Sequence, residues 1–302
     1  MIAWLFTAAL AAGPGEDAAA LDVWLARRHH QVVSDSAWVS PTEPERAATA
    51  VGAQALIAAL PACDPAEIAR ASALLAVAGW SVDAATSGGG GVVLVVTEHA
   101  PHGGGMSAWR CGDAPEIIAL APHADYDLGT DDIVRHAFTD GHLRGVMWST
   151  TRRYRALPGE QEVDPIHPGD VAHQAASLFQ TWSLSALVAD PRARLVQIHG
   201  FAAGTVDADA VISSGQVDHP PIPLLKPTAA VLGPEAPNIK VFGIDADVLG
   251  ATTNVTSRAV DGLDSPRFVH IELSPRARAL LTGDPARATR LLLALGGTPW
   301  SF

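Results

Sequence analysis

The stretch EIIALAPHADYDLGTDDIVRHAF, residues 116–138, decides the expected fold. It begins with the apolar run Ile117–Ala121, which is typical of a strand buried on both faces of a sheet. Pro122 ends this run, and a polar turn leads to Thr130, which we expect to be the N-cap of a helix. Acidic residues in the first turn favour that helix because they interact well with its amino-terminal dipole. A buried strand that leads directly into a helix is typical of an α/β fold.

The rest of the chain repeats this alternation of strand-like and helix-like segments. It predicts α/β architecture: one three-layer domain with a mostly parallel or mixed central sheet flanked by helices. The glycine-rich segment 100–115 is expected to be a loop. Strands are expected in 92–99, 116–123, 144–154, 193–201, 209–215, 239–245 and 268–275, and helices in 44–60, 64–79, 130–138, 167–190 and 285–296.

The composition of the 302-residue chain indicates a folded and acidic protein. Hydrophobic residues make up 48% of it, which is too many for a disordered chain. The net charge of −12 argues against partners that carry phosphate charges, such as nucleic acids or anionic membranes. The charge does not identify a partner; the expected partner is a small-molecule or peptide substrate, and no nucleic acid.

Residues 1–20 predict an export signal, because an apolar run at Ile2–Ala12 ends in small residues that could admit cleavage. The alternative is that this run forms an N-terminal helix of the mature fold. With export, residues 21–302 form a single mature domain that is periplasmic or secreted. No other stretch is apolar for long enough to span a membrane. In an oxidising compartment Cys63 and Cys111 could form a disulfide, and the absence of a CxxC spacing argues against a thiolate zinc site.

Histidines and carboxylates lie where several of the predicted strands end. Ligands of an α/β sheet bind at the carboxyl ends of its strands, so His123 and His199 are expected to lie close together. Imidazole and carboxylate groups are good ligands for Zn²⁺, and a catalytic zinc keeps three protein ligands and a water. We therefore predict a zinc site made of His123, His199 and Asp127, with Asp125 or Glu98 as alternatives to Asp127. Taken alone, each histidine would be interpreted as a structural polar residue.

Glu272 lies near the end of a late apolar strand, where an unpaired carboxylate is unfavourable to bury. It can act as a general base toward a water activated by zinc. The alternative is an ion pair with Arg276 or Arg278. Arg276 could instead hold a substrate carboxylate or an oxyanion through its fork of donors.

Other polar residues are candidates for contacts with a substrate. His173 lies in the predicted helix that precedes the His199 strand, and its alternative is an exposed histidine of the first turn. Asn254 and Arg258 are candidate carboxylate binders, or members of a polar loop. The adjacent His29 and His30 are expected on the surface. The chain has no GxSxG, GK[ST] or GxGxxG pattern, so neither a serine nucleophile nor a phosphate-binding loop is supported.

Taken together, these segments resemble the N-formylglutamate amidohydrolase-like group of zinc hydrolases. More distantly, they resemble the zinc carboxypeptidase and amidase folds. The resemblance is carried by APHADYDLGTD, HPGDVAHQAASLFQ, LVQIHGF and FVHIELSPRAR, which occur in this order along the chain.

The resemblance implies a zinc-carboxypeptidase-like fold and zinc-dependent hydrolysis of an amide or peptide bond near a carboxylate. His123 and His199 match metal positions of the group, Glu272 matches its catalytic carboxylate, and Arg276 matches a substrate-binding arginine. The chain departs from the carboxypeptidase pattern at Tyr126, where that pattern has a glutamate.

Three functions are compatible with these features. The first is an exported zinc-dependent amidohydrolase or peptidase. The second is a non-catalytic secreted binding protein that retains the fold, which the departure at Tyr126 favours. The third is a metal-free hydrolase in which Glu98 or Asp125 acts with a histidine, and no nucleophile motif supports it.

Overall fold

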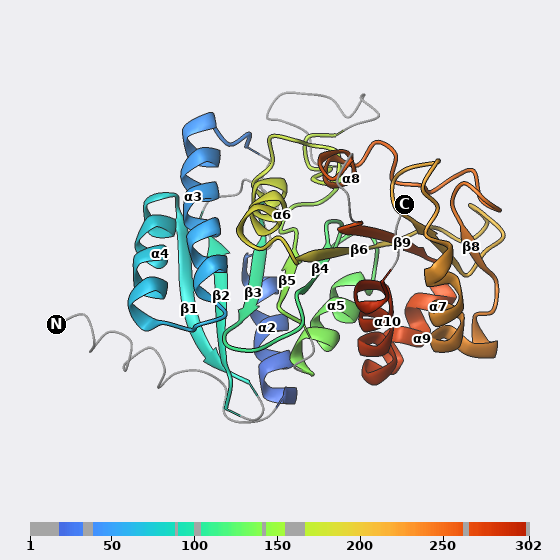
Figure 1. Ribbon diagram of the computed structural model, residues 1–302, viewed down its shortest axis with the longest axis horizontal. Helices are drawn as coiled ribbons and strands as arrows, with labels where there is room; N and C mark the ends of the chain where they lie inside the picture. Colours follow the sequence, from blue (N-terminus) through green and yellow to red (C-terminus); the bar gives the residue numbers. More distant parts are fainter. Residues whose placement is uncertain are drawn as a thin grey trace.

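In the described part of the chain, a mixed sheet of nine strands forms the centre of the protein, with helices on both of its faces (Figure 1). The strands lie in the order β1-β2-β3-β5-β4-β6-β9-β7-β8. The predicted three-layer α/β architecture is therefore confirmed. The computed structural model describes residues 18–32, 39–87, 90–99, 104–140, 143–154, 167–261 and 266–299.

The central strands β5, β4, β6 and β9 are parallel to one another. An antiparallel meander of β1, β2 and β3 extends the sheet from β5, and β7 and β8 extend it from β9. Every residue of β4 is apolar and buried, because helices cover both faces of the sheet here. The strands are Trp80–Thr86 (β1), Val92–Glu98 (β2), Met106–Arg110 (β3), Ile117–Ala121 (β4), Gly145–Trp148 (β5), Arg194–Gly200 (β6), Ala210–Ser213 (β7), Ile239–Val241 (β8) and Phe268–Leu273 (β9).

Each face of the sheet has its own hydrophobic core. Leu25, Phe138 and Leu291 lie in the core under α2, α5 and α10. Leu56 and Trp182 lie in the other core, under α3, α4 and α6. The helices are Ala18–Val32 (α2), Glu43–Ala59 (α3), Pro65–Val77 (α4), Thr130–Thr139 (α5), Leu178–Ala189 (α6), Leu225–Leu232 (α7), Val255–Ala259 (α8), Pro275–Gly283 (α9) and Pro285–Gly297 (α10), with short 3₁₀ turns at Ile222–Leu224 and Gly233–Glu235.

Local side-chain chemistry fixes the ends of the two helices predicted before the first strand. The Asp64 carboxylate caps α4 by accepting hydrogen bonds from the backbone N–H groups of Ala66 and Glu67. Gly79 follows α4 with a φ of 85°, a left-handed conformation that glycine adopts easily. Both helices are therefore confirmed, with bounds within two or three residues of those expected.

The structure corrects the bounds of two other predicted helices. The segment 167–190 is helical only over α6, because the Ser177 hydroxyl caps this helix by accepting a hydrogen bond from Gln180 N at 3.2 Å. Residues 167–177 form turns instead. Gly129, not Thr130, is the N-cap of α5, and no side chain caps that helix.

The edge strand β1 and the inner strand β3 were absent from the prediction. The glycine-rich segment expected to be a loop contains β3, which pairs with β2 and β5. β1 pairs with β2 along its whole length. Polar residues in both strands weaken the apolar pattern that predicts a strand. The strands form because they pair with neighbouring strands, which the local sequence does not show.

Helix α2 places a histidine in the interior. The prediction of a surface position for His29 is wrong: only 4% of it is exposed, and its Nε2 lies 3.1 Å from the Ser149 carbonyl oxygen. The buried Leu21 and Leu25 fix α2 against the core, which orients His29 inward while His30 remains exposed. Residues 1–17, which hold most of the predicted export signal, lie outside the described residues, so export remains a prediction.

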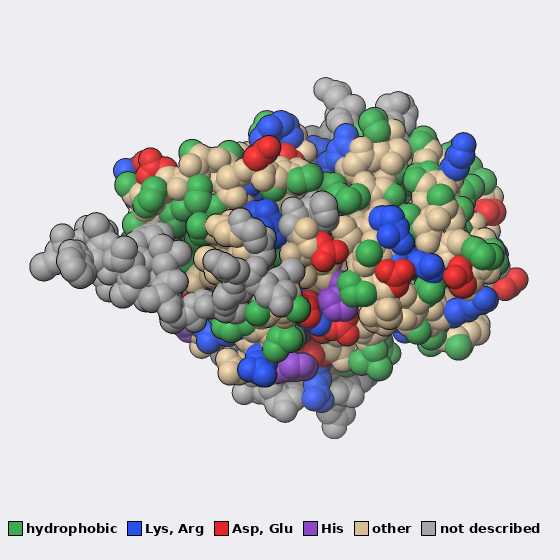
Figure 2. Space-filling view, turned by 90° about the horizontal axis from the view of Figure 1, so that it is seen from below, with side chains coloured by type: hydrophobic (Ala, Val, Ile, Leu, Met, Phe, Trp, Pro, Cys, Tyr) green, Lys and Arg blue, Asp and Glu red, His purple; other side chains and the backbone are tan. Residues whose placement is uncertain are grey.

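The described helices and the surface bear on membrane and nucleic-acid partners. None of the described helices is both long and apolar enough to cross a membrane. On the face shown in Figure 2, acidic and basic side chains are interspersed and do not gather into a broad basic band. A basic band is the usual footprint of nucleic-acid binding, and the expectation of no such partner remains a prediction.

Candidate metal centre

The carboxyl ends of β4 and β6 meet near the middle of the sheet. The chain continues from β4 to its neighbour β5 on one side, whereas β6 and β9 lie on the other side of β4. Such a reversal of strand order leaves a crevice in which α/β proteins bind ligands. His123 follows β4 directly after Pro122, and His199 is the penultimate residue of β6. The sheet therefore brings these two histidines together, as the sequence predicts.

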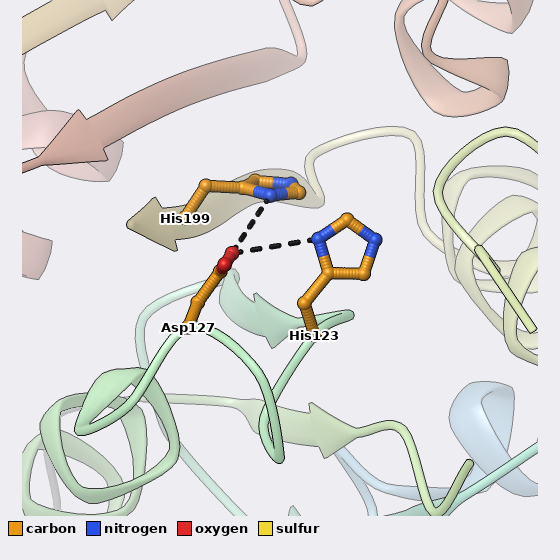
Figure 3. Close-up of side chains that lie close together, drawn as sticks. All are labelled: His123, Asp127 and His199. Carbon is orange, nitrogen blue, oxygen red and sulfur yellow. Dashed lines mark ion pairs between the residues drawn. The ribbon is translucent and has the colours of Figure 1, made fainter. Parts of the chain in front are cut away.

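The Asp127 carboxylate lies between the two imidazole rings (Figure 3). Its Oδ2 atom is 3.4 Å from His123 Nδ1 and 3.3 Å from His199 Nδ1. A tight turn after β4 brings it there, because the Asp127 N–H donates a hydrogen bond to the His123 carbonyl oxygen at 2.8 Å. The three side chains are almost fully buried, with exposed fractions of 1%, 2% and 4% for His123, Asp127 and His199.

The far nitrogen of each histidine is held by another side chain. His123 Nε2 donates to Asp170 Oδ1 at 2.8 Å, and His199 Nε2 donates to Gln197 Oε1 at 3.0 Å. Both Nδ1 atoms are therefore left to face Asp127. A partner of this kind fixes the tautomer and the ring orientation of a histidine that binds a metal.

Several polar atoms at the centre of this group lack the partners that buried polar atoms normally have. Among the described residues, His123 Nδ1 and both carboxylate oxygens of Asp127 have no hydrogen-bond partner. Ligands at zinc distances in a tetrahedral site lie about 3.3–3.5 Å apart, and the Nδ1–Oδ2 separations of 3.3 and 3.4 Å match this spacing. The donor set and its unsatisfied atoms thus fit a metal ion.

The electrostatics differ among the three side chains. Burial lowers the pKa of His123, but Asp127 and Asp170 beside it outweigh this effect and hold that pKa above the usual histidine range. Burial raises the pKa of Asp127, but His123 and His199 beside it outweigh this effect and hold that pKa well below the usual aspartate range. Burial lowers the pKa of His199 to about 4, and the charge of His123 contributes in the same direction. Asp127 is therefore ionised and His199 neutral at pH 7, which are the forms that bind a metal.

Asp170 links His123 to two more side chains. Its Oδ1 also accepts from His173 Nδ1 at 2.9 Å, and its Oδ2 accepts from Arg153 Nε at 3.1 Å. Burial raises the pKa of Asp170, but His123 and His173 outweigh burial and the net pKa lies below the usual aspartate range. Asp170 is thus an ionised carboxylate that orients His123.

Glu272 lies on β9 beside His199, with which it is in register. Burial raises its pKa to about 8, and the neighbouring charge of Asp127 adds to that increase. His270, two residues earlier on the same strand, has its Nε2 3.6 Å from Glu272 Oε1. The site therefore contains a carboxylic acid that can take or give a proton near neutral pH.

These side chains open into a cavity of about 240 Å³. Arg153 lies at this cavity with its guanidinium 5.8 Å from the centre of the Tyr126 ring and 5.7 Å from that of Tyr154. The cavity is smaller than pockets for drug-sized ligands, which occupy about 300–1,000 Å³. Its lining comprises His123, Arg153, His173, His199, Leu249–Asn254, His270 and Glu272.

The candidate residues from the sequence divide into those that line the cavity and those that do not. His173, Asn254 and Glu272 line it together with the two metal-site histidines. Asn254 is buried, and its Oδ1 caps α8 while its Nδ2 donates to Gln197 Oε1.

Four other candidates lie outside the group. Asp125 and Glu98 are in neither set of possible metal ligands among the described residues, and Glu98 accepts a hydrogen bond from Gly104 N. Arg276 and Arg258 are exposed on α9 and α8 and do not line the cavity. Helix geometry explains both positions, because each arginine precedes or follows buried residues that occupy the inward face.

The sequence assigned no role to three residues of the site. His270 could have been found, because a period of two places it on the same face of β9 as Glu272. Arg153 could have been found by collecting the polar residues that follow β5, as was done for β4 and β6. Asp170 gives no such signal. Its place beside His123 depends on turns in a segment that was predicted to be helical.

Comparisons with known proteins give only a weak likeness. No protein-family model matches the chain, and no curated protein matches it in sequence. A similar solved structure is the N-formylglutamate amidohydrolase from Ralstonia eutropha JMP134. The two share 12% sequence identity with a TM-score of 0.39, over 61% of this chain and 95% of that one. A likeness at this level carries no argument about activity, so the function is argued from the site itself.

Proposed function

We propose that the protein is a zinc-dependent hydrolase that cleaves an amide or peptide bond near a carboxylate. The observation that carries the proposal is the buried group of His123, Asp127 and His199, whose inward-facing atoms lack hydrogen bonds among the described residues but have the spacing of ligands around one ion. Structural polar clusters satisfy their buried atoms internally, and the described part of the chain does not do so for this group. The likeness to an amidohydrolase is in agreement but is not needed for the argument.

His123, Asp127 and His199 would hold the zinc. Three protein ligands of imidazole and carboxylate type are typical of catalytic rather than structural zinc. When bound, zinc lowers the pKa of a water molecule and polarises a carbonyl group of the substrate. Two histidines and one carboxylate also bind ferrous iron in non-haem iron proteins, so the metal must be identified by elemental analysis.

Glu272 is the general base of the proposal. Its carboxyl group lines the cavity beside His199, and its pKa of about 8 lies close to the working pH. A group with such a pKa can accept a proton from the attacking water and then donate it to the leaving amine. Asp127 cannot do this, because its pKa is held low by the two imidazoles.

Arg153 takes the place that the sequence analysis gave to Arg276. Among the described residues that line the cavity, Arg153 is the only arginine or lysine. Its hydrogen bond to Asp170 uses Nε, which leaves the terminal nitrogen atoms directed away from that bond. A guanidinium presents paired donors that suit a carboxylate, so Arg153 is the proposed contact for the acidic group of the substrate. Export to the periplasm or beyond the cell remains part of the proposal.

The experiment is a hydrolysis screen with the zinc-loaded full chain. N-acyl amino acids with a free carboxylate are compared with the same compounds blocked as amides, each with and without a chelator. We expect hydrolysis that the chelator abolishes and that prefers the free carboxylate at least about tenfold. Arg153→Gln should remove this preference, whereas Arg152→Gln removes the same charge from the exposed neighbouring residue and should keep it.

Two results would contradict the proposal. Hydrolysis that survives complete removal of metal would exclude the zinc mechanism. Binding of these compounds without any turnover by the zinc-loaded protein would favour a non-catalytic binding protein.

A further inference from the structure

A second group of potential metal ligands lies beside the proposed zinc site. It consists of His199, His270 and Glu272, and one ligand atom from each lies within 4.8 Å of the others. β6 and β9 are parallel, with His199 in register with Glu272 and Gln197 in register with His270. These side chains therefore project from the same face of the sheet into the same cavity.

His270 is a buried imidazole whose nitrogen atoms make no hydrogen bond among the described residues. Only 3% of the residue is exposed, and its Nδ1 has no partner. Its Nε2 is 3.6 Å from Glu272 Oε1, which is too long for a hydrogen bond. Because buried polar atoms nearly always have a partner, this geometry points to a ligand that binds here.

The separation of His270 from Glu272 is similar to the separations within the first group. The nitrogen–oxygen distances are 3.3 and 3.4 Å around Asp127 Oδ2 and 3.6 Å between His270 and Glu272. The other oxygen of Asp127, Oδ1, is also buried without a hydrogen bond among the described residues. A carboxylate with both oxygens unsatisfied can offer one oxygen to each of two metal ions.

We propose that the cavity binds a second divalent transition-metal ion, held by His270 and Glu272 beside His199, in addition to the ion of the proposed function. The inference rests on that function for the first ion and extends it to a second position. Imidazole with carboxylate is a ligand set for Zn²⁺ and related transition metals rather than for Mg²⁺ or Ca²⁺. Because the second ion binds Glu272, it removes the proposed general base, and zinc beyond one equivalent should inhibit hydrolysis.

The test is a calorimetric titration of the metal-free full chain with Zn²⁺, followed by elemental analysis after dialysis. The wild type should bind two ions in two steps. His270→Gln should keep one step and weaken the other at least about a hundredfold, since even indirect partners of a metal site change affinity by about 10- to 100-fold. Glu272→Gln should have the same effect and serves as a second variant if His270→Gln does not fold. His30→Gln, a change of an exposed histidine outside the cavity, should leave both steps unchanged.

The outcomes separate this inference from the proposed function. One ion that His123→Gln abolishes and His270→Gln leaves in place would overturn the second site and keep the first. One ion that His270→Gln abolishes and His123→Gln leaves in place would overturn both assignments. No binding by the wild type would also overturn both. Two ions with the selective losses described would support both.

Discussion

The two ends of the central strands carry buried polar clusters of opposite character. At the amino ends, Arg144 donates to both carboxylate oxygens of Glu116 at 3.0 and 3.1 Å and to the carbonyl oxygens of Arg110 and Gly112 at 2.8 and 2.7 Å. At the carboxyl ends, the inward-facing atoms of His123 and Asp127 have no hydrogen bond among the described residues.

The difference distinguishes a cluster that stabilises the fold from one that binds a ligand. Arg144 is 3% exposed, and it ties the start of β5 to the segments before β4 through partners within the chain. Desolvation of such a cluster is compensated internally. The cluster at the other end is equally buried, but among the described residues nothing completes it, which supports the metal proposed there.

The largest expected effect is on catalysis. Glu272→Gln keeps the size of the side chain but removes the group that accepts the proton, so hydrolysis should fall about 100- to 10,000-fold. The first zinc equivalent should bind as before, because Glu272 belongs to the other ligand group. Steady-state kinetics together with elemental analysis measures both quantities. A variant with normal turnover would exclude Glu272 as the base.

A change in the cluster at the amino ends of the strands should lower stability and leave zinc binding unchanged. Arg144→Met leaves the Glu116 carboxylate without its main buried partner, and loss of one member of a buried pair destabilises a protein by about 3–5 kcal/mol. Urea unfolding measures this loss, and zinc binding by the folded fraction should be unchanged. Arg192→Met removes an exposed arginine from the same Glu116 and should have a much smaller effect. Equal effects of the two variants would show that the buried contacts of Arg144 do not stabilise the fold.

Zinc should stabilise the fold only through the cluster at the carboxyl ends of the central strands. A ligand at 100 times its dissociation constant raises the free energy of unfolding by about 2.7 kcal/mol if it binds only the folded state. His123→Gln should lose this stabilisation, and Arg144→Met should keep it despite its lower baseline. Thermal or urea unfolding with and without zinc measures the difference. Stabilisation that survives in His123→Gln would place the metal elsewhere.

A further expected effect is on the pH dependence of the metal-free protein. Burial raises the pKa of Glu272 from 4.5 to about 8, so the folded state binds more protons than the unfolded state between these values. The free energy of unfolding should therefore contain a contribution that is complete below pH 4.5 and is lost as pH rises to about 8. Its slope is at most about 1.4 kcal/mol for each pH unit. Glu272→Gln should remove this contribution in urea unfolding with a chelator present, and an unchanged pH profile would mean that Glu272 is not buried as described.

The sequence predicted the features that depend on local pattern. Apolar runs predicted β4 and β6, and the rule that ligands gather at strand ends predicted the meeting of His123 with His199. Asp127 was preferred over Asp125 by its spacing from His123, and a hydrogen-bonded turn produces that spacing.

The features that depend on long-range pairing were not predicted. Asp170 reaches His123 across 47 residues of sequence, and no local pattern encodes such a contact. The sequence of β1 gave no strand signal because it is partly polar. The strand is stabilised by its pairing with β2, which a local pattern does not show. The arginine was misplaced for a related reason: Arg276 follows Glu272 closely in sequence, but α9 directs it to the surface.

The most direct test of the metal site is the zinc content of three purified proteins: wild type, Asp127→Asn and Asp125→Asn. The two variants lose the same charge within one turn of the chain, but Asp127 alone belongs to the ligand group among the described residues. After dialysis against a low concentration of zinc, the wild type and Asp125→Asn should contain at least one zinc per chain, and Asp127→Asn should contain less. Equal zinc content in all three proteins, or none in the wild type, would contradict the metal centre proposed at His123, Asp127 and His199.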